Sequence, residues 1–264
     1  MVRLLRLLLL LFLVWACQNK ETYPHLTENT ESFRDASLRP FFHGVASGDP
    51  LPNAVIIWTR VTPITQEPSV EVIWEIAIDK TFNNIAATGT LTTGPEKDYT
   101  VKIDIDSGLT AGTNYFYRFK ALGGVSMVGK TKTAPETASE VRFAVVSCSN
   151  YEWGYFNAYA RVAEERNINA VLHLGDYIYE YGPGRYGDTT IGRFNIPPRE
   201  IVSLQDYRDR YALYRLDPDL QAAHANHPFI NIWDDHEITN DSYKEGAENH
   251  QPEEGDYTTR KGIA

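Results

Sequence analysis

Three apolar segments of this 264-residue chain end in side chains that can bind a metal ion. The segments cover 141–147, 170–174 and 229–233, and the groups that follow them are Cys148, Asp176, Tyr179, Asp234, Asp235 and His236. Each segment has the length and composition of a buried strand. The carboxyl ends of parallel strands meet at one edge of a sheet, so the pattern predicts a polynuclear metal site at that edge.

The donor atoms suit a hard, highly charged cation. Tyrosinate and carboxylate are anionic oxygen ligands, and a thiolate adds charge and covalency when the cation is iron. Asp176 and Tyr179 are three residues apart just after a strand, so a turn can direct both toward one ion. Structural interpretations compete: Cys148 as a core filler, Asp176 as a helix cap, Tyr179 as a core residue and His236 as a hydrogen-bonding group. Their coincidence at three strand ends favours the metal site.

The surrounding pattern predicts an α/β unit over residues 141–264. A helix is expected at 153–166, where the apolar residues share one face, and with its flanking strands it forms a β-α-β unit with a parallel, buried sheet. Further helices are expected at 204–214 and from 217 to about 225. Residues 182–200 are rich in Gly, Pro and Arg, which indicates a long insertion beside a strand end.

Residues 41–134 have the pattern of an all-β domain. The segment 54–61 is a predicted strand, and 70–78 alternates apolar and polar residues with period two. The segment 109–118 resembles the end of an immunoglobulin-like or fibronectin-like domain, where a tyrosine after a turn hydrogen-bonds with the backbone. The polar stretch 132–139 is the expected linker to the second domain.

The N-terminus has the composition of an export signal. A short basic start precedes an apolar core of about ten residues, too short to span a bilayer at roughly 20. Ala16-Cys17 resembles a bacterial lipoprotein cleavage site, after which Cys17 would be lipidated; ordinary signal cleavage elsewhere is the alternative. We expect residues 1–16 to be a lipoprotein signal peptide and 17–40 a flexible tether. The protein is then exported, anchored to the outer or cytoplasmic membrane on its periplasmic or extracellular face.

Cysteine usage and charge narrow the functional classes. The chain has two cysteines, so Cys148 has no intrachain partner once Cys17 is lipidated or removed. A redox-active thiol is weakly supported, because the sequence has no Cys-x-x-Cys motif. The net charge is −10, from 25 basic and 35 acidic residues, which argues against nonspecific nucleic-acid binding. Small anionic esters are not excluded, because a metal centre supplies local positive charge.

Several blocks of the sequence resemble PhoD-type alkaline phosphatases, a branch of the metallophosphoesterases. The blocks are Ser147-Cys148-Ser149-Asn150, Gly175-Asp176-Tyr177-Ile178-Tyr179-Glu180 and Trp233-Asp234-Asp235-His236-Glu237, together with 42–50 and 58–60 in the β domain. The resemblance runs from about residue 41 to the end of the chain. It implies a two-domain α+β/α/β fold, with an immunoglobulin/fibronectin-like β-sandwich (41–134) followed by an incomplete α/β metallophosphoesterase sandwich (141–264).

The resemblance also implies the metals and their ligands. Cys148, Asp176 and Tyr179 would hold Fe3+, with Asp176 bridging to a divalent ion, Ca2+. Asp235 is expected to hold the second metal, rather than Asp234, because it stands where the wider superfamily has an Asn ligand.

The implied reaction is direct in-line hydrolysis of phosphate mono- and diesters by a metal-activated water, the activity of an alkaline phosphatase and phosphodiesterase. His236 matches the histidine that contacts the phosphate or leaving group in the superfamily. Asn150, near the iron ligands, is a weaker candidate for a site residue.

The chain is shorter than the members of the family it resembles. The family's remaining ligands lie beyond the Asp-Asp-His-Glu block, and no His-x-His is present in this sequence. We therefore expect a fragment that lacks the C-terminal ligands. The alternative is an inactive exported β-sandwich binding lipoprotein with a remnant phosphatase domain. The intact set of Cys148, Asp176, Tyr179, Asp235 and His236 argues against such decay.

Overall fold

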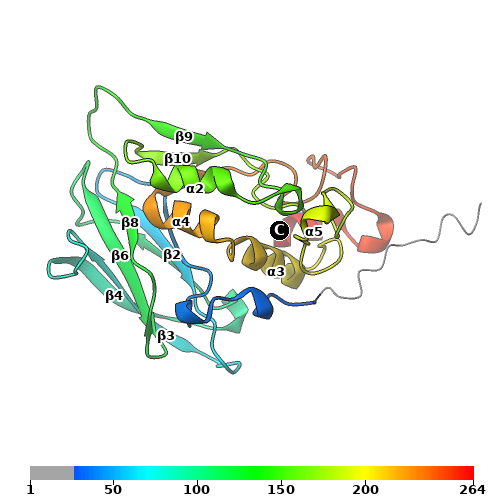
Figure 1. Cartoon of the computed structure of the whole chain (residues 1–264), viewed down its shortest axis with the longest axis horizontal. Coiled ribbons are helices and arrows are strands. Elements are labelled where there is room, and N and C mark those ends of the chain that lie inside the picture. Colours follow the sequence, from blue (N-terminus) through cyan, green and yellow to red (C-terminus); the bar gives the residue numbers. More distant parts are fainter. Residues whose placement is uncertain (1–26) are drawn as a thin grey trace, which may run out of the picture.

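The structure is a computed structural model that describes residues 27–264. The predicted signal peptide and Cys17 lie outside the described residues. Within 27–264, none of the helices has the length and apolar character needed to cross a membrane. Two β-sheets and a group of short helices make up this part of the chain (Figure 1).

The regular elements follow one another in an all-β half and a mixed half. The strands are β1 (Val45–Gly48), β2 (Val55–Arg60), β3 (Val70–Ala77), β4 (Ile85–Thr93), β5 (Thr100–Ile105), β6 (Asn114–Ala121), β7 (Gly124–Val125), β8 (Gly129–Lys132), β9 (Phe143–Val146), β10 (Ala170–His173) and β11 (Pro228–Asn231). The α-helices are α2 (Asn157–Glu164), α3 (Leu204–Tyr214), α4 (Pro218–Asn226) and α5 (Tyr257–Ile263). Short 3-10 turns are η1 (Glu31–Phe33), η2 (Ala36–Leu38), η3 (Pro95–Lys97), η4 (Tyr151–Trp153), η5 (Thr189–Ile191) and η6 (Pro252–Glu254).

One six-stranded sheet contains strands from both predicted domains, in the order β5-β2-β1-β11-β10-β9. Strands β5, β2 and β1 are antiparallel to one another. Strand β1 then pairs in parallel with β11, and β11, β10 and β9 continue in parallel. The predicted linker is therefore not a boundary between separate sheets. The β half is built into the edge of the parallel sheet that carries the candidate site.

The β half encloses its own apolar core. Strands β4, β3, β6 and β7, with β8 beside β6, form a second sheet, and buried side chains from both sheets make one cluster that includes Ile57, Val72 and Tyr117. The tyrosine expected after the turn is Tyr115, whose hydroxyl accepts a hydrogen bond from the Thr110 N–H at 2.8 Å. This confirms the predicted corner.

The parallel half follows the predicted β-α-β order. Helix α3 has the expected bounds, and α4 begins at Pro218 with the Asp217 carboxylate accepting from the N–H groups of its first turn. The first helix is shorter than predicted, because a 3-10 turn with Asn150 as its cap precedes it and α2 begins only at Asn157. Its expected apolar face does pack on the second core, through Phe156 and Tyr159.

The prediction that all three site segments are buried is wrong for the end of the third one, where Ile230, Ile232 and Trp233 are exposed, and it is wrong for β9. It is the last strand of the sheet, and the side chains of Phe143 and Val145 are exposed. Helices α2 and α4 pack together over one face of β9–β11 (Figure 1). The opposite face carries exposed apolar side chains, among them Val145 and Ile230, because the described residues do not cover it.

The tether predicted for 17–40 is also wrong over its described part. Residues 27–40 contain η1 and η2, and Thr30 and Pro40 are buried. The Glu28 carboxylate lies 2.5 Å from the Arg199 guanidinium, and the guanidinium of Arg34 lies 5.5 Å from the centre of the Phe42 ring. Polar composition alone did not reveal that these contacts hold the segment against the fold.

Candidate metal centre

The three loops that carry the predicted ligands lie together. They follow β9, β10 and β11, which are neighbours in the parallel sheet, so their carboxyl ends open at the same edge. Gly175 allows the second and third loops to meet. A Cβ at that position would lie 2.4 Å from the Asp234 backbone nitrogen, and its φ of +97° favours glycine.

Hydrogen bonds lock the loops to one another. The Cys148 N–H donates to the Gly175 carbonyl at 3.1 Å, and the Ser149 N–H donates to the Asp176 carbonyl at 2.8 Å. The buried Glu237 carboxylate accepts from the backbone N–H groups of Asp176 at 3.1 Å and of Asp234 at 2.9 Å. The ligand-bearing backbone is therefore held in one arrangement.

Two of the predicted ligands have left-handed backbone conformations. Cys148 has a φ of 58° and Asp176 a φ of 55°. A non-glycine residue in this region costs free energy, on the order of 1–3 kcal/mol, and persists where the surrounding structure enforces it. Here the inter-loop hydrogen bonds enforce it, and both side chains turn toward the same space.

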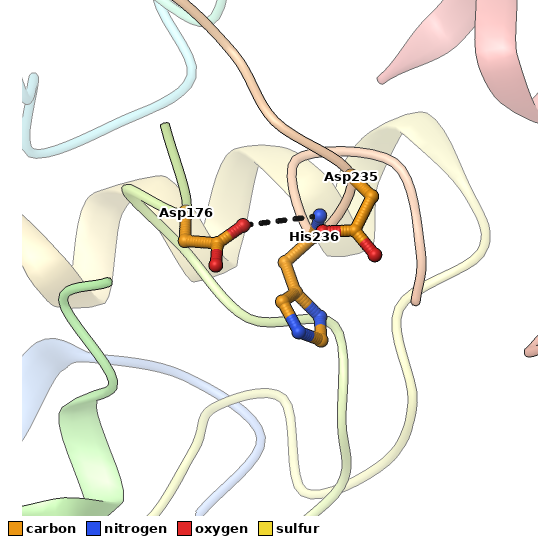
Figure 2. Close-up of side chains that lie close together, drawn as sticks. All are labelled: Asp176, Asp235 and His236. Carbon is orange, nitrogen blue, oxygen red and sulfur yellow. Dashed lines mark hydrogen bonds between the residues drawn. The ribbon is translucent and has the colours of Figure 1, made fainter. Parts of the chain in front are cut away.

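Asp176 lies at the centre of the cluster. Its Oδ2 is 3.5 Å from the Cys148 sulfur and 3.2 Å from the Tyr179 hydroxyl. Its Oδ1 accepts from the backbone N–H of His236 at 3.4 Å (Figure 2). Asp176, Asp235 and His236 each offer a ligand atom within 4.8 Å of the other two. The two carboxylate oxygens thus face two different groups of potential ligands.

The ionisable groups at this site resist taking up negative charge unless a cation is bound beside them. Burial, followed by the negative charges of Asp176 and Cys148, raises the pKa of the Tyr179 phenol far above its usual value. Burial also raises the pKa of the Asp176 carboxyl. A bound cation would reverse these shifts by stabilising the anionic forms. The donor set of thiol, phenol and carboxylates therefore fits a metal with a high charge.

The structure brings all five predicted site residues into this cluster and decides between several interpretations. Cys148 is exposed at the site, so it is not a core filler. Asp234 is exposed outside the cluster, which supports the preference for Asp235. Asn150 uses its amide within the protein, accepting from the Glu152 N–H at 3.0 Å and donating to the Tyr186 carbonyl at 2.9 Å.

Glu180 is a site residue that the sequence patterns did not single out. Its fully buried carboxylate accepts from His236 Nδ1 at 2.7 Å and from Asn240 N–H at 2.8 Å. Burial opposes the charged imidazolium, but the hydrogen bond and charge of Glu180, followed by the charges of Asp176 and Asp235, raise the pKa of His236. The available signal was the position of Glu180, directly after Tyr179 in the second ligand block.

Family comparisons cover almost all of the described chain. Residues 143–264 match the family described as PhoD-like phosphatase, and residues 27–135 match the PhoD-like phosphatase N-terminal domain. The two matches together include both sheets and all three ligand loops.

Individual relatives agree with these matches. The chain is 45% identical over 213 residues to alkaline phosphatase D of Bacillus subtilis (strain 168), an alignment that covers 77% of this chain and 36% of the relative. A solved structure described as PhoD superposes with a TM-score of 0.77 at 40% identity, covering 87% of this chain and 45% of the other. The chain therefore spans less than half the length of these two proteins.

Proposed function

The chain belongs to the PhoD-like phosphatase family, and from this premise we propose that it hydrolyses phosphate mono- and diesters at the cluster around Asp176. The observation that carries the proposal is the position of the Asp176 carboxylate. One of its oxygens faces Cys148 and Tyr179, and the other faces the loop of Asp235 and His236. A carboxylate placed in this way can bridge two cations.

We assign Fe3+ to Cys148, Asp176 and Tyr179, and Ca2+ to Asp176 and Asp235. Thiolate and phenolate ligands favour ferric iron, whereas carboxylate oxygens suit calcium. Bound metal ions of this kind lower the pKa of a coordinated water and neutralise phosphoryl oxygens, so direct in-line hydrolysis needs no covalent enzyme intermediate.

We assign to His236 a contact with the phosphate or the leaving group. Its Nδ1 is held by Glu180 at 2.7 Å, which leaves Nε2 to donate a hydrogen bond or proton to an oxygen of the ester. In this arrangement Glu180 is a positioning residue, and Glu237 keeps the second and third loops in register.

The decisive test compares Asp176→Asn with His236→Ala in the purified chain loaded with both metals. The first substitution keeps the side-chain volume but removes the anionic bridge, so at least one metal should be lost, together with hydrolysis of both ester classes. The second should lower turnover while most of the bound metal remains. Plasma mass spectrometry and hydrolysis of nitrophenyl phosphate mono- and diesters measure the two effects. Full metal content and normal turnover in Asp176→Asn would leave the two-metal proposal without support.

The iron assignment has a separate optical test. A ferric ion held by Cys148 and Tyr179 should absorb visible light through ligand-to-metal charge transfer, and Tyr179→Phe should bleach or shift that band. Tyr243→Phe is the matched control, since Tyr243 is exposed outside the ligand cluster. An active protein that is colourless and free of iron would overturn the assignment.

We also propose that the protein is exported and anchored through a lipid on Cys17. The support is the sequence around Ala16-Cys17 alone. Metabolic labelling with a radioactive fatty acid should tag the protein, and Cys17→Ser should abolish the label. A label that survives this substitution would show that the lipid is attached elsewhere.

A further inference from the structure

Two large aromatic side chains next to the metal centre are exposed to solvent. The exposed fractions are 58% for Trp153 and 49% for Tyr186. Their rings meet edge to face with centroids 6.1 Å apart. The Tyr186 ring also lies 6.0 Å from the ring of Tyr179 and 6.5 Å from that of His236, within 16° of parallel to the imidazole. Aromatic surface thus extends continuously from the candidate catalytic histidine to solvent.

The loop that carries Tyr186 is fixed to the turn after β9. The Asn150 amide donates to the Tyr186 carbonyl at 2.9 Å. The buried Glu152 carboxylate accepts from the N–H groups of Gly184 at 2.9 Å and Asn195 at 2.8 Å. These bonds hold the aromatic surface in place before any ligand arrives, which lowers the entropic cost of binding.

We propose that Trp153 and Tyr186 form a stacking platform for a planar aromatic group of the phosphate ester, a nucleobase being the test case. Exposed aromatic faces bind such groups by stacking, and the gain in affinity is roughly 5- to 150-fold for one base. The site would therefore select nucleotides over phosphate esters of plain sugars. This inference rests on the phosphoester hydrolysis proposed above and adds the substrate class.

The test compares two substrates that differ only in the base, 5′-AMP and ribose 5-phosphate. The metal-loaded chain should have a kcat/KM for 5′-AMP at least about five-fold higher. Trp153→Ala and Tyr186→Ala should each lower that ratio toward one. The matched control is Tyr155→Ala, because Tyr155 is also an exposed aromatic residue near Trp153 but packs over Arg193, with 5.1 Å from guanidinium to ring centre. This variant should keep the wild-type ratio.

The outcomes separate the platform from the hydrolytic function. Hydrolysis of both substrates with equal kcat/KM, or a preference that survives both substitutions, would overturn the platform and leave the hydrolytic function standing. If neither substrate is hydrolysed, the hydrolytic function fails, and calorimetric binding of the same two compounds decides the platform. Tighter binding of 5′-AMP that is lost in Tyr186→Ala supports it, and equal binding refutes it.

Discussion

At the scale of single residues, the pair of Glu180 and His236 controls what the candidate site can do. One oxygen of Glu180 accepts from His236, while the other accepts from Asn240 N–H and the Asn249 amide. All of these partners are donors, so the pocket requires a carboxylate with two accepting oxygens. Such a partner holds the imidazole with a proton on Nδ1 and aims Nε2 at the site.

Glu180→Gln should therefore lower turnover without removing metal. If the new glutamine carbonyl keeps the bonds to Asn240 and Asn249, the glutamine NH2 group faces His236 Nδ1. Two donors cannot bond to each other, so Nδ1 must then accept a hydrogen bond and carry no proton. The imidazole becomes neutral and a weaker acid, so we expect the turnover of a nitrophenyl diester to fall about ten-fold or more. Hydrolysis rates and metal content measure the effect.

Thr239→Val is the control for this substitution. Thr239 donates to the same Glu180 carboxylate at 3.2 Å, but to Oε1, whereas His236 bonds with Oε2. Its loss should lower thermal stability with little effect on turnover. Equal turnover losses in both variants would show that Glu180 acts through stability alone.

At the scale of the elements, the corner at Tyr115 anchors the end of the β half. The buried hydroxyl accepts from the Thr110 N–H, and β6, which carries Tyr115, pairs with both β3 and β8. Tyr115→Phe keeps the ring but leaves a partly buried N–H without its partner. We expect a loss of about 1 to 3 kcal/mol in the free energy of unfolding.

Urea denaturation measures this loss as a lower midpoint with an unchanged slope. Tyr155→Phe is the matched control, because Tyr155 is exposed and its hydroxyl group supports no corner. A midpoint for Tyr115→Phe within error of this control would contradict the anchoring role.

At the scale of the whole molecule, one face of the parallel sheet is apolar and open. Val145, Leu172 and Ile230 form a row across β9, β10 and β11, and Val145 and Ile230 are 59% and 38% exposed. Contiguous exposed apolar surface promotes association. We expect the purified chain to bind a hydrophobic dye and to self-associate as its concentration rises.

The double substitution Val145→Lys with Ile230→Lys should reduce both the dye fluorescence and the association. Ile64→Lys is the control, since Ile64 is 84% exposed in the β half, away from this row. Dye titration and sedimentation velocity provide the measurements. A monomer at all concentrations that binds no dye would contradict the expectation.

The sequence by itself determined the features that depend on neighbouring residues. Helix α3 has the bounds that its pattern predicts, and β10 covers most of the predicted segment, since periodicity and caps act over a few positions. The order of the three ligand blocks, together with the rule that parallel strands share a carboxyl edge, was sufficient to predict that Cys148, Asp176 and Asp235 converge.

Only the tertiary structure decided the features that depend on distant pairs. Strand β1 joins the two halves by pairing with β11, and no local pattern encodes that pairing. The partner of Glu180 lies 56 positions away in the chain, so the second ligand block alone does not reveal which side chain the Glu180 carboxylate binds. The exposure of β9 and of Tyr186 depends likewise on what packs beside them. Burial is a property of the assembled chain, because it depends on which surfaces meet and not on the residue type alone.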